Sequence, residues 1–364
     1  MTIDHAPDDD VLSAPSPDVD IETAQALARR HFGIAGELSR LSGERDRNFH
    51  VRTACGAEYV LKFAHPSEDT RIADFQTQAL LHVADADADL PVQRVMRTRD
   101  GLPQVTLRVD DPMTPIDDAE TTVSGRTRVL RLFSYLPGLP WPAAERSVAQ
   151  QHNLARMLAR LDIALRDFRH PAGDLHLPWD IQRADTVAPL LAAIADPERR
   201  ALAARSLARF VDHARPVLPH LRAQPIHNDM NIHNVLVAPD AHDTIAGILD
   251  FGDMVHAPLI DDLAVAAAYQ LTPSADPAAA IAGFVAAYHA VNPLRADEVD
   301  VLFDLMMARM VMVVAIGGWR AARYPENAEY ILRNNAISWQ RLAACDAVPR
   351  ATAQRVLRAA CNLS

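Results

Sequence analysis

One stretch of the chain, QPIHNDMNIHNVLVAPDAHDTIAGILDFGD (224–253), has the residue types and spacing of a reaction centre. It places the carboxylate of Asp229, the amide of Asn234 and the carboxylate of Asp250 within little more than twenty positions. Crowded hard oxygen groups of this kind, with no cysteine beside them, favour Mg²⁺ over zinc. The stretch therefore predicts a magnesium site or a reaction that uses these carboxylates.

The two carboxylates are far apart in the stretch, so a fold must bring them together. The apolar runs 235–237 and 245–249 flank a polar turn at 239–243, which predicts an antiparallel hairpin. Pairing of the two runs would bring Asn234 and Asp250 together at the open end of the hairpin, close to Asp229.

A single lysine, Lys62, is the second chemical signal. The chain has 36 Lys and Arg residues, and 35 of them are Arg. Phosphoryl transfer needs a point positive charge on nucleotide phosphates, Mg²⁺ held by an Asp and an Asn, and a carboxylate facing the acceptor hydroxyl. An ammonium on a flexible stem fits among phosphate oxygens where a guanidinium fork is bulkier and more rigid. We interpret Lys62 as a phosphate-binding lysine.

The elements around Lys62 are mostly strands. Alternating residues predict a hairpin of 48–53 and 58–64, joined by the turn 54–57, with Lys62 on its second strand. Three- and four-residue apolar spacing predicts a helix over 69–83. A first helix at 23–32 and further strands at 91–96, 103–109 and 126–133 complete this part.

After SYLPGLPW (134–141) the sequence changes to long Ala, Leu and Arg helices, the first at 144–168. The predicted fold class is α+β, with a small β-rich lobe and a larger helical lobe. The predicted boundaries are a disordered tail (1–20), an N-terminal nucleotide-binding lobe (21–133), a hinge (134–140) and a helical lobe with the catalytic loop and substrate site (141–364).

Composition excludes several classes of protein. A net charge of -11 argues against non-specific nucleic-acid binding, which depends on basic patches, and suits a small cationic substrate. The longest apolar run, 310–318, is about half of what a bilayer needs. The acidic, Pro- and Ser-containing N-terminus lacks the pattern of a signal peptide. Three widely spaced cysteines argue against a disulfide framework or a zinc site, so we expect a cytoplasmic protein.

Several motifs together resemble a known fold. His227-x-Asp229-x-x-x-x-Asn234, followed by Asp250-Phe251-Gly252, with Val60-Leu61-Lys62 on an N-terminal strand, resembles the protein-kinase-like fold. IHNDMNIHNVLV and PLIDDLAVAAAY are similar to the aminoglycoside phosphotransferase family, which includes choline, homoserine and hydroxylysine kinases. LSGERDRNFHV, LFSYLPG and GGWRAARYPENAEY look most like its hydroxylysine kinase branch. The resemblance covers roughly 21–345.

The resemblance implies roles for individual residues. Asp229 would be the catalytic base or hydroxyl-orienting carboxylate, Asn234 and Asp250 the Mg²⁺ ligands, and Lys62 the phosphate lysine. The loop 42–48, with Ser42, Gly43 and Asn48, would cover the nucleotide phosphates, and Ser134, Tyr135 and Leu136 would bond the base.

Two features depart from the kinase pattern. The phosphate loop has one glycine, Gly43, instead of a Gly-rich run. The helix after Lys62 offers Gln76 or Gln78 where a glutamate partner for the lysine is expected. A neutral amide accepts a hydrogen bond but supplies no counter-charge.

Other residues have competing interpretations. We expect His227 to prop the loop rather than shuttle protons, and Asp262 to be an N-cap or loop brace rather than a substrate ligand. His233 with His227 and Asp229 is a weaker match to a metallohydrolase cluster, since no third His or carboxylate follows at ligand spacing. In the C-terminal third, we expect core positions at Met306, Met307, Met310 and Met312. A site for a substrate carboxylate, or plain surface, is expected at Trp319, Arg320 and Tyr324. Ligands of a cationic group, or plain surface, are expected at Glu326 and Glu329.

These observations predict a small-molecule kinase that transfers the γ-phosphate of ATP or GTP, with Mg²⁺, to a hydroxyl of an amino-acid or amino-alcohol acceptor such as 5-hydroxylysine. One alternative is a protein serine/threonine kinase of the same fold, which the early helix after Asp250-Phe251-Gly252 disfavours. Another is a non-catalytic nucleotide-binding module. Neither nucleic acid nor membrane is an expected partner, and a homodimer stays an option.

Overall fold

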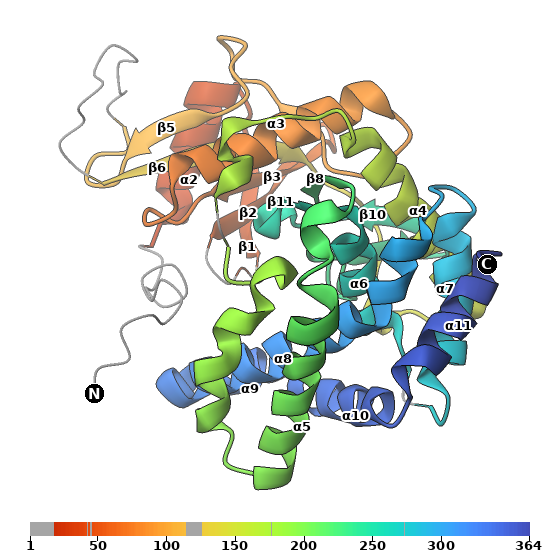
Figure 1. Ribbon diagram of the computed structural model, residues 1–364. Coiled ribbons are helices and arrows are strands. Elements are labelled where there is room, and N and C mark those ends of the chain that lie inside the picture. Colours follow the sequence, from red (N-terminus) through yellow and green to blue (C-terminus); the bar gives the residue numbers. More distant parts are fainter. Residues whose placement is uncertain (1–17, 42, 44–45, 114–125, 176, 273) are drawn as a thin grey trace. The chain divides into compact units, whose positions relative to one another are not determined.

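The computed structural model describes residues 18–41, 43, 46–113, 126–175, 177–272 and 274–364. The chain forms two compact units (Figure 1). The first unit comprises Met1–Pro137 and His170–Leu175, and the second comprises Gly138–Arg169 and His176–Ser364.

An antiparallel sheet is the centre of the first unit, with strand order β1-β2-β3-β6-β4 and β5 paired to β6. Its strands are β1 (Gly36–Leu41), β2 (Arg47–Thr53), β3 (Glu58–Phe63), β4 (Val95–Met96), β5 (Val105–Arg108) and β6 (Thr127–Ser134). The predicted hairpin of β2 and β3 is present, with Asn48 paired to Lys62 and Arg52 to Glu58. The turn between them exposes Cys55, whereas Cys345 and Cys361 are buried, and all three cysteines are free.

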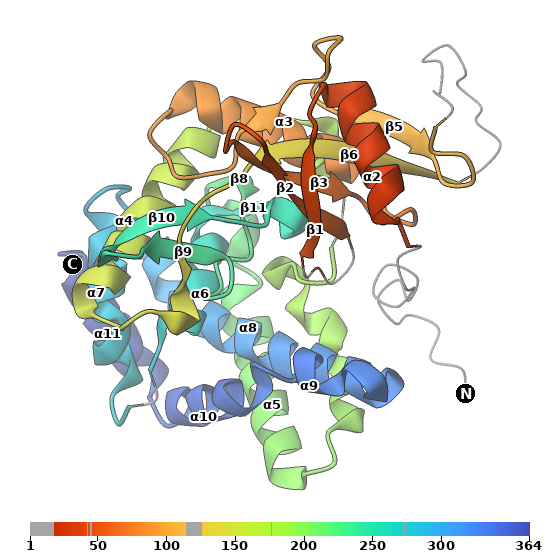
Figure 2. The same cartoon turned by 180° about the vertical axis from the view of Figure 1, so that it is seen from behind.

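Helices cover both faces of this sheet (Figures 1 and 2). α2 (Ile21–Leu27) and the helical turn Ala28–Phe32 pack on the face that carries Phe49, Leu61 and Leu130 in a shared apolar core. α3 (Thr70–Ala86), capped by Asp69, covers the other face, where Ala73 packs on Ala64 and Val129. Because strand residues alternate between faces, Lys62 points to the α3 side and its neighbours Leu61 and Phe63 to the core.

The second unit is mainly helical. Its helices are α4 (Val148–Leu165), α5 (Pro197–Arg209), α6 (Leu259–Gln270), α7 (Pro277–His289), α8 (Ala296–Arg323), α9 (Ala328–Ile331), α10 (Asn335–Asp346) and α11 (Arg350–Ala360). Its short strands are β7 (Leu139–Pro140), β8 (Ala223–Ile226), β9 (Val235–Ala238), β10 (Ala241–Ile248) and β11 (Val255–Pro258). They form a β10-β9-β7 sheet and a β11-β8 pair. Mixed α and β structure with an antiparallel sheet and a helical remainder confirms the predicted α+β class.

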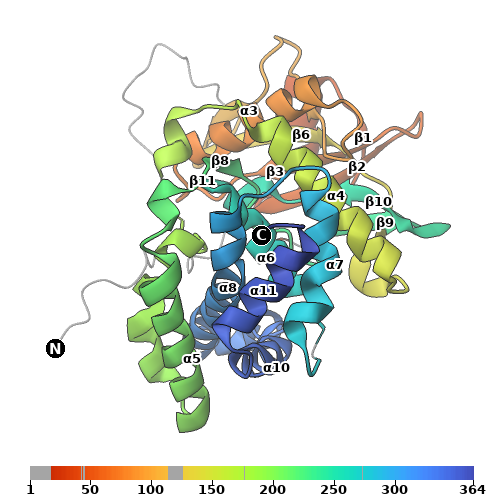
Figure 3. The same cartoon turned by 45° about the vertical axis from the view of Figure 1, so that its right-hand side comes forward.

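The long helix α8 is the core of the second unit. Met306, Met307, Met310 and Met312 are at most 2% exposed, which confirms their assignment to the core. α8 contacts α5, α6, α10 and α11, and α7 lies beside α11 (Figure 3). No helix in the described part of the chain is long and apolar enough to cross a membrane.

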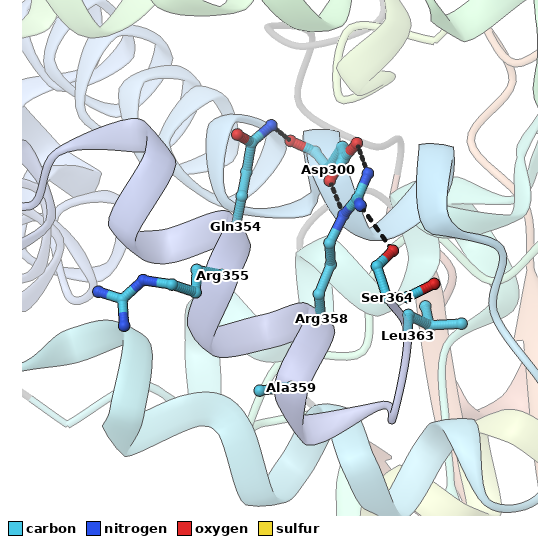
Figure 4. Close-up of a pocket in the computed structure, with 7 residues that line it drawn as sticks. All are labelled: Asp300, Gln354, Arg355, Arg358, Ala359, Leu363 and Ser364. Carbon is cyan, nitrogen blue, oxygen red and sulfur yellow. Dashed lines mark hydrogen bonds and ion pairs between the residues drawn. The ribbon is translucent and has the colours of Figure 1, made fainter.

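A surface hollow of about 420 Å³ lies where α11 and the C-terminal residues meet α8 (Figure 4). Arg358 donates to the carboxylate of Asp300 at 2.6 and 2.5 Å and to the carbonyl of Ser364 at 2.9 Å. Gln354 donates to the backbone carbonyl of Asp300 at 3.0 Å. These contacts hold the C-terminus and α11 on α8, so the polar groups of the hollow serve the fold.

Several predicted boundaries differ from the structure. The strand 91–96 shortens to Val95–Met96, and the helix 144–168 becomes α4, which begins at Val148 because Ser147 caps it through Gln150. The predicted polar turn 239–243 is shorter, since Ala241 already pairs with Ala238 and irregular pairing absorbs the following residues. The end of this hairpin is held by α4, because Gln150 donates to His242 O at 2.8 Å.

Candidate active site

The loop between β8 and β9 carries Asp229, and His227 fixes its first turn. The backbone N–H of Asp229 donates to Nδ1 of His227 at 3.2 Å, so the proton of the neutral ring lies on Nε2, which donates to Leu249 O at 3.0 Å. The ring also packs edge-on against Phe251, with centroids 4.8 Å apart. Both ring nitrogens are engaged, which confirms that His227 props the loop.

The carboxylate of Asp229 is held at both oxygens. Oδ2 accepts hydrogen bonds from Asn234 Nδ2 at 2.8 Å and Asn231 Nδ2 at 2.9 Å. Oδ1 accepts from Arg309 Nη2 at 3.1 Å. The side chain of Asp229 is 16% exposed, so the carboxylate is fixed in orientation yet can be reached by a small group.

Opposing effects set the charge of Asp229. Burial raises its pKa to about 7, and the nearby carboxylates of Asp253 and Asp250 act in the same direction. The guanidinium of Arg309 and the hydrogen bond from Asn231 act to lower the pKa. A cation bound near Asp250 would offset the carboxylate repulsion and favour the ionised form.

Arg309 is the one basic residue that the described contacts place on Asp229. It lies in the middle of α8 and is 2% exposed. Nη1 donates to Trp179 O at 2.9 Å, and the guanidinium stacks on the rings of Trp179 and Tyr269, 5.1 and 5.9 Å from their centroids. The side chain is therefore fixed on several sides, and it presents one N–H to Asp229.

The predicted hairpin of β9 and β10 brings Asn234 and Asp250 together. Val235 pairs with Ile248, and Leu249 N–H donates to Asn234 O at 2.8 Å, so Asp250 follows directly after the last paired position. Asp250 has φ 60° and Asn228 has φ 62°, the left-handed region that is unfavourable for residues other than glycine. Strained backbone of this kind is often retained where it aims functional groups.

The side chains at this end of the hairpin fit Mg²⁺. Asn234 uses Nδ2 on Asp229, so its carbonyl oxygen is the atom left for a cation, and Asp250 is exposed. In the part of the chain that the structure describes, no three His, Cys, Asp or Glu side chains are grouped to hold a metal. Two protein oxygens suit Mg²⁺, which commonly keeps waters and takes substrate phosphates as its other ligands.

Asp262, in the first turn of α6, braces the Asp229 loop. Its Oδ2 accepts from the backbone N–H of His227 at 2.9 Å and its Oδ1 from Asn228 N–H at 2.8 Å. Asp162 of α4 accepts from the hydroxyl of Tyr288 at 2.5 Å, and burial together with the nearby charge of Asp262 raises the pKa of Asp162. Asp262 is thus a loop brace, one of the two structural roles expected from the sequence.

The other predicted group of residues lies in the first unit, around Lys62. The ammonium of Lys62 forms an ion pair with Asp46, Nζ to Oδ2 2.8 Å. Asn48 and Arg131 lie directly opposite Lys62 on the two neighbouring strands, so the three side chains share one face of the sheet. Gln76, the expected lysine partner, accepts a hydrogen bond from Arg131 Nη1 at 2.8 Å.

Gly43 lies close to Asp46 and Asn48. A Cβ at position 43 would lie 2.7 Å from Asp46 O and from Asn48 Nδ2, so the close approach requires glycine. Ser42, also predicted for this loop, lies outside the described residues.

The segment predicted to bond the nucleotide base follows β6. The backbone N–H of Ser134 donates to Arg94 O at 2.9 Å, and that of Tyr135 to Glu58 O at 3.2 Å. These two N–H groups already have partners within the first unit, so a base would meet the N–H of Leu136 or the carbonyl groups of the segment.

The substrate candidates Trp319 and Arg320 lie near the end of α8. Arg320 is 8% exposed, and Trp319 stacks with Arg323, 5.7 Å from guanidinium to ring centroid. Arg320 follows Arg309 by eleven residues, or about 16 Å along the helix axis. The structure therefore does not bring Arg320 to Asp229.

Sequence reasoning missed Asp46, Asp253 and Arg309. Asp46 lies in LSGERDRNFHV, but nothing in that stretch links it to Lys62. The signal for Arg309 was its position, a charge among the apolar residues of MMARMVMVV. A buried charge in such a helix needs a partner.

A kinase-like arrangement follows from this geometry: a lysine on the third strand of an antiparallel sheet, and a helical unit with an Asp loop and an Asp-Phe-Gly hairpin. Comparison with known proteins agrees, since residues 37–299 match the model of the phosphotransferase enzyme family. The chain belongs to this family and is a phosphotransferase acting on a hydroxyl group.

Curated relatives narrow the class of phosphotransferase to which the chain is similar. The chain is 26% identical to the hydroxylysine kinase of Mus musculus over 339 residues, which cover 88% of this chain and 87% of that protein. It is 28% identical to the hydroxylysine kinase of Danio rerio, covering 84% and 85%. These relatives support a small-molecule kinase.

Solved structures agree in fold. An amicoumacin kinase in complex with AMP-PNP, Ca²⁺ and Ami has a TM-score of 0.61 at 13% identity, covering 91% of this chain and 95% of that one. A microcompartment-associated aminopropanol kinase has a TM-score of 0.58 at 18% identity, covering 94% and 98%.

Proposed function

We propose that this protein transfers the γ-phosphate of ATP to the hydroxyl of a small amino-acid-like acceptor, with 5-hydroxylysine as the first candidate. The observation that carries the proposal is the Asp229 carboxylate, fixed at both oxygens and still 16% exposed. The hydroxylysine kinase relatives support the acceptor class, and a related fold with AMP-PNP bound supports ATP.

The proposed roles follow from the chemistry of the side chains. Asp229 orients the acceptor hydroxyl toward the phosphorus and accepts its proton as the new bond forms. Lys62 places its positive charge on the phosphates. Asn234 and Asp250 would hold Mg²⁺, which offsets the negative charge on the phosphate oxygens when bound. Of the residues predicted for the base, Leu136 is the one we propose to contact it through its backbone.

Asp229 acts mainly as an orienting group in this proposal. A loose phosphoryl-transfer transition state requires little removal of the hydroxyl proton before bond formation. Neutral Asn side chains and Arg309 hold the carboxylate in place, so its geometry is set before the acceptor arrives. Preorganisation of this kind lowers the barrier without a strong base.

The structure favours a small acceptor over a protein acceptor. α6 begins at Leu259, and the strand β11 (Val255–Pro258) occupies most of the chain between Asp253 and that helix. This leaves little chain for a segment that would present a peptide. A purely nucleotide-binding module is disfavoured by the complete set Lys62, Asp229, Asn234 and Asp250. We propose that the protein works in the cytoplasm, and GTP and a homodimer remain alternatives to test.

The test is a coupled assay of nucleoside diphosphate release with Mg²⁺ and either ATP or GTP. The acceptor panel is hydroxylysine, homoserine, choline, ethanolamine and an aminoglycoside, and Asp229→Asn is the control. We expect turnover that depends on hydroxylysine and is lost in the control. Nucleotide binding without transfer to any acceptor would contradict the proposal and favour a binding module.

We predict that Asp250→Asn abolishes turnover with Mg²⁺ and ATP but leaves the fold intact. The substitution removes the anionic metal ligand, while the amide keeps the size of the side chain, which is exposed and accepts one local hydrogen bond from Gly252 N–H. Turnover and the thermal midpoint are measured together. Turnover equal to that of the wild type would contradict the metal assignment.

A further inference from the structure

Lys62 has an anionic partner, and this partner is not on the helix α3. Asp46 Oδ2 lies 2.8 Å from Lys62 Nζ, and the two side chains are 15% and 18% exposed. Asp46 Oδ1 accepts the backbone N–H of His65 at 3.0 Å. Both carboxylate oxygens are thus engaged, one by the ammonium and one by the chain just after β3.

Arg131 explains why α3 carries a neutral amide at the expected position. Arg131 is 1% exposed and lies opposite Lys62 on β6. It donates to Gln76 Oε1 at 2.8 Å and to Ala73 O at 3.2 Å, so Gln76 and the Ala73 carbonyl of α3 engage this second cation. A glutamine satisfies the guanidinium without adding a charge, and the counter-charge for Lys62 comes from the loop that precedes β2.

We propose that Asp46, which directly precedes β2, is the positioning residue for Lys62, so that the orientation of the phosphate lysine depends on this carboxylate. This inference rests on the proposed function, because it assigns Lys62 to the nucleotide phosphates. It concerns the described residues Asp46, Lys62 and His65.

The proposed role has a distinctive kinetic consequence. Asp46 orients the ammonium, but its negative charge also opposes the approach of phosphate oxygens. Removing Asp46 should therefore slow phosphoryl transfer, which depends on the position of the charge, without weakening the binding of nucleotide in the ground state. Removing Lys62 itself should both slow phosphoryl transfer and weaken the binding of nucleotide.

The experiment compares the wild type with Asp46→Ala, Lys62→Ala and the matched control Asp18→Ala. Asp18 forms an ion pair of 2.7 Å with Arg40 in the same unit, but its side chain is 66% exposed. Calorimetry gives the Kd of a non-hydrolysable ATP analogue with Mg²⁺, and kcat is measured on the acceptor that the wild type uses. For Asp46→Ala we expect a loss of about 10- to 100-fold in kcat with no weaker Kd, and for Asp18→Ala no change in either.

A second readout does not depend on transfer. Lys62 is the single lysine of the sequence, so the rate at which an amine-directed acylating reagent modifies it can be followed by mass spectrometry of its peptide. Asp46 covers and pairs the ammonium, and Asp46→Ala should speed this modification several-fold, whereas Asp18→Ala should not. If Asp46→Ala does not fold, Asp46→Asn keeps the shape of the side chain and is expected to give the same results.

The outcomes separate the inference from the proposed function. A wild type that transfers phosphate to no acceptor contradicts the proposed function, and the acylation rates still decide whether Asp46 holds Lys62. A kcat of Asp46→Ala equal to that of the wild type, a Kd weakened as much as in Lys62→Ala, or an unchanged acylation rate would each overturn the inference.

Discussion

At the scale of single residues, the site depends on charged partners that are distant in sequence. Arg309 lies 80 positions after Asp229 and contacts its carboxylate at 3.1 Å. The guanidinium is almost fully buried. It keeps its charge because Asp229, Trp179 O and two aromatic rings surround it. The pair fixes the direction of the Asp229 carboxylate.

We predict that Arg309→Met lowers kcat by roughly 100-fold, because Asp229 Oδ1 loses its donor and a buried negative charge loses its partner. Arg309→Lys keeps the charge but has no fork to reach both Trp179 O and Asp229, so its loss should be smaller. Steady-state kinetics and circular dichroism on both variants check this. A wild-type kcat in a folded Arg309→Met variant would show that Arg309 serves only packing.

At the scale of elements, the helix α6 holds the Asp229 loop through its first turn. Asp262 accepts the backbone N–H groups of His227 and Asn228, and this lets Asn228 keep its left-handed conformation. The hairpin of β9 and β10 then sets the spacing of Asn234 and Asp250. The helix, the loop and the hairpin together place Asp229, Asn234 and Asp250, which are separated in sequence, in one region of the second unit.

Asp262→Ala should lower the free energy of unfolding by about 2–5 kcal/mol, because two buried backbone donors lose their acceptor. The matched control is Asp297→Ala, which removes an exposed aspartate from the first turn of α8 and should cost less than about 1 kcal/mol. Denaturant unfolding of the two variants provides the comparison. Equal losses would contradict the bracing role of Asp262.

Sequence reasoning predicted the elements better than their tertiary contacts. The hairpin of β2 and β3, the helix α3 and the pairing of β9 with β10 follow from local alternation and spacing, and all are present. Asp46 and Arg309 were not predicted, because an ion pair between distant positions leaves no periodic signal. Gln76 was chosen by analogy, and its contact with Arg131 depends on which strand lies beneath α3.

At the scale of the whole molecule, the stability of the fold depends on pH through the buried acids that lie beneath the Asp229 loop. Asp162 is fully buried, and burial together with the neighbouring charge of Asp262 raises its pKa well above the ordinary value. The folded protein therefore retains a proton on Asp162 at a pH at which the unfolded chain has released it. Stability from this group is present below the ordinary carboxyl pKa and is lost as pH rises toward the folded-state pKa.

Asp162→Asn should remove this pH dependence, because an amide keeps the size of the side chain and can accept from Tyr288 as the acid does, but it does not titrate. We predict that the variant gains stability relative to the wild type as pH rises from about 4 toward neutrality. Urea midpoints across this range measure the difference. The control is Asp212→Asn at an exposed position, and a constant difference across pH would contradict a protonated Asp162.

The exposed turn between β2 and β3 carries a free cysteine, Cys55, through which the first unit can be labelled selectively. The hydrogen bond with Thr53 lowers the pKa of the Cys55 thiol, whereas burial raises the pKa of Cys345 to about 12 and of Cys361 to about 11. A maleimide dye at neutral pH will therefore attach at Cys55 and spare the second unit. The native chain already contains a fluorescence reporter position in its first unit, without the removal of any cysteine.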